Sequence, residues 1–259
     1  MALMERLPLE RDTAFGLLRE ASQSSEQVFH NDIYYTFMNK QAGFECRLVY
    51  PATEAHVAKY TEQERRMVHE TPEQHRLITR PFWKALFDSG QIAWVDNILL
   101  GKKEADRVLL NTDDIMLLFD TKWTDHDNVQ GLYLLGLFKA SLLSVRDLDG
   151  SSVELLERVR AALQSFFATE PYKFPDGRPV LYENLRIYFH YPPTYPHLHL
   201  HVTLITGSAI GNASVGQAIL LDDVIENLRL DHLYYKDHRT LTFQMGVGHA
   251  LFKQLCPDQ

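Results

Sequence analysis

The chain has 259 residues, 45% of them hydrophobic and 23% charged, which is the composition of a soluble protein with a sizeable core in one large domain or two modest ones. Its net charge of −8 and pI of about 5.8 argue against a protein that coats long nucleic acid, because such proteins usually present a basic face. Two distant cysteines argue against a disulfide framework and for a reducing compartment, and no apolar run approaches the ~18 residues of a membrane span.

The first part of the sequence predicts a small α+β lobe. Residues 12–22 have the pattern of a short helix, and the aromatic and β-branched runs at 31–37 and 46–50 predict two strands. The charged segment 52–69 predicts a long helix, and its largely polar surface suits a connector between lobes. A second helix is predicted over residues 72–88.

After Gly90 the pattern changes to short apolar runs separated by polar turns. These runs predict strands over residues 105–110, 114–120, 132–138, 185–191, 197–205 and 240–245. Residues 151–168 predict an amphipathic helix, for which Ser151 and Glu154 fit a capping box, and residues 219–228 predict another helix. The fold class predicted for this part is α+β, built on an antiparallel meander.

Residues 190–204, HYPPTYPHLHLHVTL, hold four histidines. Successive side chains of a strand point to opposite faces, so His197, His199 and His201 would share one face while the intervening apolar residues pack on a core. Three imidazoles on one face are seldom a packing solution, and His190 on the preceding strand would add a fourth. Two chemistries remain open from the residues alone: a zinc site, or nucleophilic catalysis in which one imidazole attacks phosphorus.

The segment HLHLHVTL matches the histidine-triad pattern, in which histidines alternate with apolar residues, and the longer HYPPTYPHLHLHVTLI resembles the scavenger mRNA-decapping enzymes of that superfamily. Further segments resemble the same family in the same order, over about residues 2–256: NDIYYTF, LVYPATEAHVAKY, NILLGKKEADRV, DTKW, SVRDL, DVIENL and RTLTF. The resemblance implies an N-terminal α+β lobe over 1–62, a helical connector over 63–91 and a C-terminal histidine-triad domain over 92–259. It also implies a homodimer that swaps the N-terminal lobe, which would be shortened relative to the family.

The resemblance further implies a hydrolase of phosphoric anhydrides, a pyrophosphatase that acts on N7-methylguanosine cap dinucleotides and short capped RNAs after 3′-to-5′ mRNA decay. The products would be N7-methylguanosine monophosphate and a nucleoside or oligonucleotide 5′-diphosphate. His199 would form a covalent nucleotidyl-histidine, His201 and His190 would bind or polarise phosphate oxygens, and His197 would orient His199. No metal, other cofactor, membrane or long nucleic acid is expected, and the expected location is cytoplasmic, with the nucleus as a further option.

The cap-binding residues also follow from the resemblance. N7-methylation makes guanine cationic, so a site that prefers it needs an aromatic face, supplied by Trp94, and a carboxylate, supplied by Glu104. Asp120 would contact the base or ribose, and Lys122 would bind phosphate as a point charge. Thr121 stands under the base, where the family usually has an apolar residue. The remaining expected substrate contacts are Thr194, Tyr195, Asn31, Tyr34 and Lys59.

Three alternatives stay open. The protein could be a general histidine-triad hydrolase of dinucleoside polyphosphates or nucleoside phosphoramidates, but Trp94 and Glu104 count against this because adenine lacks the cation and the matching donor edge. It could be a cap-binding module without turnover, which would keep those two residues and would not require His199. It could also be a zinc hydrolase that uses the histidine face.

Overall fold

The computed structural model describes residues 26–31, 34–39, 44–53, 64–90, 92–123, 125–169, 171–207 and 213–258. The chain forms two compact units, Met1–Glu62 and Gln63–Gln259. The helix predicted for residues 12–22 lies outside the described residues.

The first unit contains a three-stranded antiparallel sheet in the order β1-β2-β3. The strands are β1 (Glu26–Asn31), β2 (Tyr34–Asn39) and β3 (Phe44–Val49). The sequence predicts the strands that become β2 and β3, whereas β1 lacks a clear alternating pattern and was not predicted. Within this sheet the rings of His30 and Tyr35 stack with their centroids 4.2 Å apart.

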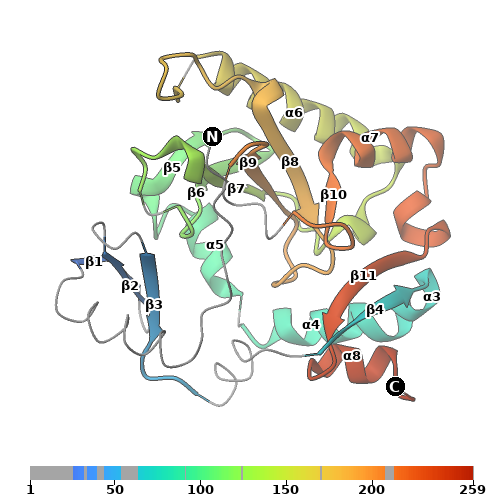
Figure 1. The fold of residues 1–259 in the computed structure, drawn as a ribbon. Coiled ribbons are helices and arrows are strands. Elements are labelled where there is room, and N and C mark those ends of the chain that lie inside the picture. Colours follow the sequence, from blue (N-terminus) through green and yellow to red (C-terminus); the bar gives the residue numbers. More distant parts are fainter. Residues whose placement is uncertain are drawn as a thin grey trace, which may run out of the picture. The chain divides into compact units, whose positions relative to one another are not determined.

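The second unit is built on a six-stranded antiparallel sheet in the order β10-β8-β9-β7-β6-β5 (Figure 1). Its strands are β5 (Val108–Asn111), β6 (Ile115–Phe119), β7 (Tyr133–Phe138), β8 (Leu185–His190), β9 (His199–Leu204) and β10 (Ala218–Leu220). The predicted α+β class is therefore confirmed. The predicted meander holds for β5, β6 and β7, but β9 lies between β7 and β8, so β8 is not next to its predecessor in the chain.

Helices lie on both faces of this sheet (Figure 1). Those described in the second unit are α3 (Pro72–Gln74), α4 (Arg80–Asp88), α5 (Ala93–Leu99), α6 (Val153–Ala168), α7 (Leu221–Leu230) and α8 (Ala250–Leu255). The π-helical turn η1 (His75–Thr79) joins α3 to α4, so the helix predicted over residues 72–88 is confirmed as one run. Apolar residues of α6 and α7 pack with one face of the sheet, and Val95 and Ile98 of α5 pack with Met116 and Leu118 on the other.

The sequence predicts the amphipathic body of helix α6 better than the residue at which the helix begins. Leu156, Val159, Leu163 and Phe167 are fully buried, and burial of each such side chain contributes roughly 1.5–3 kcal/mol relative to exposure. The predicted capping box of Ser151 with Glu154 is wrong. A 3-10 turn precedes the helix, and the box is formed by Asp149 and Ser152: Asp149 Oδ1 accepts from the Ser151 amide at 3.0 Å, and the Asp149 amide donates to Ser152 Oγ at 3.3 Å.

The helix predicted over residues 52–69 is wrong in its last turn. Residues Arg65–Glu70 form strand β4, which pairs antiparallel with β11 (Leu241–Gly246) in a separate two-stranded sheet. Much of the preceding predicted segment, residues 54–63, lies outside the described residues. The charged pattern indicated a helix because the pairing partner of β4, in which Phe243 stands opposite the buried Val68, is far away in the sequence.

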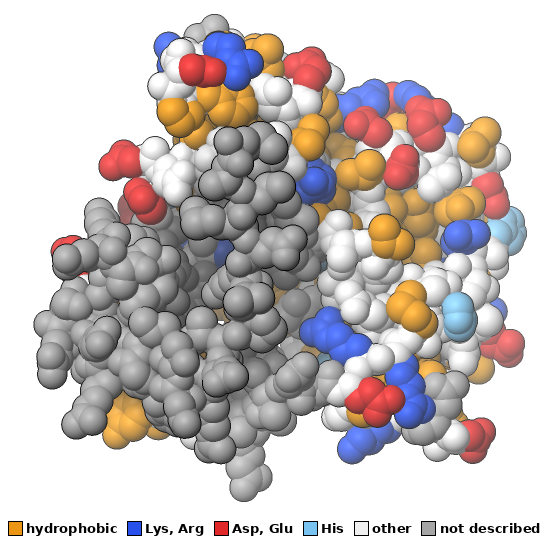
Figure 2. Space-filling view, in the orientation of Figure 1, with side chains coloured by type: hydrophobic (Ala, Val, Ile, Leu, Met, Phe, Trp, Pro, Cys, Tyr) orange, Lys and Arg blue, Asp and Glu red, His pale blue; other side chains and the backbone are white. Residues whose placement is uncertain are grey.

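On the face of the molecule in Figure 2, the Lys and Arg side chains are interspersed with Asp and Glu rather than gathered in one stripe. Among the described residues, no helix is both long enough and apolar enough to cross a membrane.

Candidate active site

Three histidines lie at and just before the start of β9. The strand begins at His199 and continues through His201, whereas His197 lies in the segment that leads into it. Leu137 of β7 stands opposite His199, and Leu135 stands opposite His201, so the imidazoles share the face that α5 covers. The predicted alternation is confirmed, because the intervening side chains belong to the core on the other face: Leu198, Leu200 and Val202.

The proton on the His199 ring is fixed by a main-chain carbonyl. Nδ1 of His199 lies 2.6 Å from the carbonyl oxygen of His197, and that oxygen can only accept, so Nδ1 carries the proton and Nε2 keeps its lone pair. The His197 ring is held in turn, since its Nε2 donates to the carbonyl of Phe138 at 2.8 Å. Burial lowers the pKa of His199 to about 3, so the imidazole is neutral at pH 7.

His201 lies beside His199, and His190 lies beside His201. The ring centroids of His201 are 5.1 Å from those of His199 and 4.4 Å from those of His190. Both ring nitrogens of His201 are buried and have no hydrogen-bond partner among the described residues, and burial lowers the pKa of this ring well below its ordinary value. A buried imidazole in that state has an unmet desolvation penalty that a bound ligand with acceptor or donor oxygens would relieve.

Tyr195 connects the histidines to Trp94. The Tyr195 ring lies parallel to His199, with centroids 4.2 Å apart, and its edge meets the Trp94 ring at 4.8 Å. Trp94 is the second residue of α5, a helix that was not predicted, and 37% of its surface is exposed. Such exposure is unusual for a large aromatic side chain and leaves a face of the indole available for a ligand.

Glu104 is held in a strained backbone conformation by the loop after α5. Its φ of 55° is the left-handed region, which a residue other than glycine seldom adopts and which is often found at functional sites. Arg107 donates to Glu104 Oε2 at 2.6 Å, and its other terminal nitrogen donates to the carbonyl of Phe119. This arginine therefore fixes the carboxylate of Glu104 next to the end of β6.

Asp120 and Lys122 follow β6 directly. Asp120 is buried, and its Oδ1 accepts from the Lys122 amide at 2.9 Å. This hydrogen bond closes a turn in which the side chain of Thr121 is exposed to solvent. Nζ of Lys122 donates to Oη of Tyr133 at 3.1 Å and lies 4.6 Å from the centre of that ring. The Tyr133 ring in turn meets the His201 ring, with centroids 5.4 Å apart, so Lys122 lies one side chain away from the histidines. Burial is the main cause of the lowered pKa of His199, and the positive charge of Lys122 is a smaller one.

The other expected substrate contacts are placed less fully. Thr194 is exposed on the turn before β9. Asn31 ends β1 and Tyr34 begins β2 in the first unit, and Lys59 lies outside the described residues. The approach of these first-unit residues to a ligand stays a prediction.

Two tyrosines of the site were not predicted from the sequence. Tyr188 of β8 stands opposite His201, and Tyr133 of β7 meets the His201 ring edge-on, with both centroids 5.4 Å from that imidazole. The alternation of β8 gives a signal for Tyr188, because residues 188 and 190 point to the same face of the strand. No comparable signal marked Tyr133, since β7 is apolar throughout and buried on both faces.

The arrangement combines a neutral imidazole whose Nε2 keeps its lone pair, a second buried imidazole without a hydrogen-bond partner among the described residues, a cation and an exposed indole. This set suits the attack of His199 Nε2 on a phosphorus atom whose oxygens are held by neighbouring donors. Among the described residues, no group of three or more His, Cys, Asp or Glu side chains is placed to hold a metal ion.

Comparisons with known proteins show the family of the chain. Residues 1–63 match the family model described as "Scavenger mRNA decapping enzyme (DcpS) N-terminal", and residues 93–214 match "Scavenger mRNA decapping enzyme C-term binding". The m7GpppX diphosphatase of Schizosaccharomyces pombe is 34% identical over 98% of this chain and 85% of that protein. The human m7GpppX diphosphatase is 34% identical over 98% of this chain and 74% of its own length, and that of Ascaris suum is 33% identical over 88% and 74%. Because two family models match in order and these relatives align over most of both chains, this chain belongs to the scavenger mRNA decapping enzyme family.

Proposed function

We propose that this chain is an m7GpppX diphosphatase that hydrolyses N7-methylguanosine cap dinucleotides and short capped RNAs to N7-methylguanosine monophosphate and a 5′-diphosphate. The observation that carries the proposal is the hydrogen bond from His199 Nδ1 to the His197 carbonyl, because it leaves Nε2 of a neutral imidazole as the nucleophile. The names of the full-length relatives support the substrate.

The reaction runs in two displacements. Nε2 of His199 attacks the phosphorus next to the methylguanosine, a P–N bond forms, and the P–O bond to the departing diphosphate breaks. Water then attacks the same phosphorus and loses a proton to the solvent, the P–N bond breaks, and its electron pair returns to Nε2. We assign the unpaired His201 ring and the Lys122 ammonium to the phosphate oxygens, and we assign His190 a supporting role beside His201.

We assign recognition of the base to Trp94 and Glu104. A cationic methylguanine stacks on an indole with a cation–π attraction of roughly 0.5–2 kcal/mol, which the unmethylated base lacks. The carboxylate of Glu104, fixed by Arg107, accepts from the N1–H and the amine of guanine. We assign Asp120 to the base or ribose, Thr121 to the underside of the base, and Thr194 and Tyr195 to the triphosphate.

A product assay on the methylated cap dinucleotide, with the unmethylated dinucleotide as the matched control, tests the proposal. Methylguanosine monophosphate plus nucleoside diphosphate, formed much faster from the methylated substrate, is the expected result. Equal rates on both substrates would identify a general histidine-triad hydrolase, and binding without product would identify a cap-binding module. Methylguanosine diphosphate as the product would mean cleavage of the opposite anhydride bond. Loss of turnover in EDTA would identify the zinc hydrolase.

We also propose that the chain works as a homodimer in which the first unit contributes Asn31, Tyr34 and Lys59. A sheet of three short strands buries too little apolar surface to be stable alone, and in this unit Leu48 is 48% and Tyr50 is 69% exposed. A second chain that pairs with this sheet would cover those side chains, as a swapped lobe does. Light scattering after size exclusion should give twice the 30.0 kDa chain mass, and a monomer that turns over normally would contradict the dimer. A cytoplasmic or nuclear location stays a prediction.

A further inference from the structure

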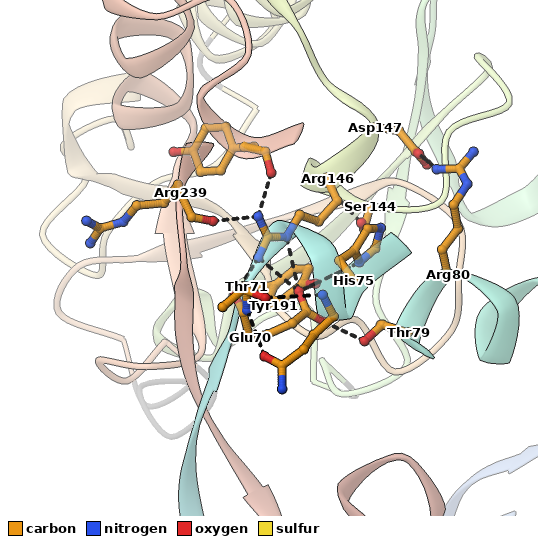
Figure 3. A network of polar contacts seen from close by, with 12 residues as sticks. Glu70, Thr71, His75, Thr79, Arg80, Ser144, Arg146, Asp147, Tyr191 and Arg239 are labelled. Carbon is orange, nitrogen blue, oxygen red and sulfur yellow. Dashed lines mark hydrogen bonds and ion pairs between the residues drawn. The ribbon is translucent and has the colours of Figure 1, made fainter. Parts of the chain in front are cut away.

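A buried polar network lies beside the start of the segment that carries Tyr195 (Figure 3). At its centre Glu70, the last residue of β4, forms an ion pair with Arg146 at 2.9 Å, and neither side chain has any solvent exposure. Tyr191 donates to Glu70 Oε1 at 2.5 Å, and Thr79 donates to Oε2 at 2.5 Å. Nδ1 of His75 lies 3.3 Å from the Tyr191 hydroxyl. Four side chains therefore surround the Glu70 carboxylate, and two of them, Arg146 and Tyr191, come from distant parts of the sequence.

Arg146 is satisfied completely. Its Nε and one terminal nitrogen donate to Glu70 Oε1 at 3.1 and 2.9 Å, and the same terminal nitrogen reaches the Glu70 carbonyl at 2.9 Å. The other terminal nitrogen donates to the carbonyls of Tyr235 and Arg239, each at 2.6 Å. Although burial acts to raise it, contacts from His75, Thr79 and Tyr191 hold the pKa of Glu70 below its ordinary value. Because desolvation offsets much of the attraction in a buried ion pair, such a network is better explained by the geometry that it fixes than by stability.

The geometry in question is that of the proline loop, residues 192–196. Tyr191 immediately precedes this loop, and its main-chain amide donates to the carbonyl of Gln217 at 2.9 Å. Strand alternation sends the His190 ring toward His201 and the Tyr191 ring to the opposite side, where it packs among aromatic rings of the core. The network therefore holds the start of the loop from the core side of the sheet, opposite the face that carries the histidines.

The exit of the proline loop rests on the segment before Arg146. The amide of Leu198 donates to the carbonyl of Leu142 at 2.6 Å, and the His197 ring donates to the carbonyl of Phe138. Arg146 lies in the 3-10 turn η4 (Val145–Asp147), four residues after Leu142. The ion pair of Glu70 and Arg146 is therefore linked to both ends of the loop. Glu70 contacts Tyr191 at the start, and Arg146 lies in η4, next to the segment that bonds the end of the loop.

We propose that the network of Glu70, Arg146 and Tyr191 sets the geometry of the proline loop, so that Tyr191 is a positioning residue for the stacked pair of Tyr195 and His199. The effect on turnover rests on the proposed function, whereas the effect on the pair can be measured without substrate. Tyr191 touches no reacting atom, and it acts by fixing the plane against which the nucleophilic ring lies.

The test is Tyr191→Phe in the full chain, which keeps the ring and removes only the hydroxyl. On the methylated cap dinucleotide kcat should fall about tenfold, because small displacements of aligned groups are costly, while KM changes less than about threefold. KM should change by the smaller factor because Trp94 and Glu104, which are assigned to the base, come from other elements, and only the triphosphate contacts assigned to Thr194 and Tyr195 lie in the loop. In the ligand-free protein, the ring protons of His199 should shift in NMR spectra, because the ring current of Tyr195 depends on their stacking.

Tyr235→Phe is the matched control, since it removes another buried hydroxyl, which pairs with Asn227 at 2.8 Å and lies outside the network. It should leave kcat and the His199 resonances unchanged. Thr79→Val, which removes the donor to the other Glu70 oxygen, should change both in the same direction as Tyr191→Phe and by less, and it decides the matter if Tyr191→Phe does not fold.

Wild-type kcat and wild-type His199 resonances in Tyr191→Phe and Thr79→Val would overturn the positioning role, even if both variants melt earlier. If the wild-type protein does not hydrolyse the cap dinucleotide, the proposed function fails, and the resonances still decide whether Tyr191 positions the pair.

Discussion

The phenol ring of Tyr195 lies almost parallel to the imidazole of His199, with 14° between the two planes and 4.2 Å between their centres. The hydrogen bond to the His197 carbonyl fixes one edge of the imidazole, and the stacked phenol fixes its face. The Trp94 ring also contacts Tyr195, nearly at right angles and with the centroids 4.8 Å apart. Three rings in contact therefore join the indole assigned to the base with the nitrogen assigned to the phosphorus.

Replacing His199 with Asn should lower kcat by several orders of magnitude and leave the Kd of the cap nearly unchanged. The amide can occupy the position of the ring but cannot form the P–N bond. Single-turnover assays should detect a phosphoramidate-linked nucleotide in the wild type and none in the variant, and calorimetry should give similar Kd values. A His199→Asn protein that still hydrolyses the cap would refute the nucleophile assignment.

Tyr195→Phe and Tyr195→Ala separate the ring from its hydroxyl. The hydroxyl is buried without a partner among the described residues, and burial raises its pKa, so it is a neutral donor. If the hydroxyl binds the triphosphate, Tyr195→Phe should raise KM severalfold with little change in kcat. Tyr195→Ala should also lower kcat by at least about tenfold, because the imidazole loses its stacking partner. Equal kinetic constants for the two variants would show that stacking is unimportant.

Trp94→Ala should reduce the preference for methylated over unmethylated cap. The expected loss of roughly 0.5–2 kcal/mol corresponds to about a 2- to 30-fold smaller ratio of kcat/KM values. Trp94→Phe should retain part of the preference. Since the side chain is more than one-third exposed, thermal melting should change little, and an unchanged ratio in Trp94→Ala would move base recognition to another residue.

Stability should fall as the pH is lowered from 7 to 5. The unfolded His199 binds a proton near its ordinary pKa of 6.5, whereas burial keeps the folded ring neutral down to about 3. The unfolded state therefore binds more protons in this window, and the free energy of unfolding drops by up to about 1.4 kcal/mol per pH unit for this group. His199→Asn should show a shallower decline in urea titrations between pH 5 and 7. If the stability of both proteins fell equally with pH, the lowered pKa of His199 in the folded state would be contradicted.

The histidine face could be predicted because its information is local. Alternation along β9 is enough to put His199 and His201 on one side, and the packed leucines on the other side stabilise that register, while His197 lies in the segment just before the strand. The resemblance of the flanking segments supplied Trp94 and Glu104, which no spacing rule connects to β9. The amphipathic body of α6 was predictable for the same local reason.

The features that depend on distant pairing could not be predicted. Strand β4 has a helical charge pattern, and its extended form depends on β11. Helix α5 is short, and its burial against β6 decides its structure more than its sequence does. The buried ion pair of Glu70 with Arg146 could not be predicted either, because nothing in the sequence near one residue indicates that it pairs with the other.

The pairing of β4 with β11 also has a consequence for synthesis of the protein. His69 Nδ1 and Thr242 Oγ1 lie 3.0 Å apart across these strands, although 173 residues separate them in the sequence. At a translation rate of about 5–20 residues per second, roughly ten to thirty seconds pass between their appearance on the ribosome. During that interval β4 lacks its strand partner, so the brace behind the proline loop is completed only when the chain has been made through β11. The nascent protein should therefore acquire the final geometry of the proline loop only late in its synthesis.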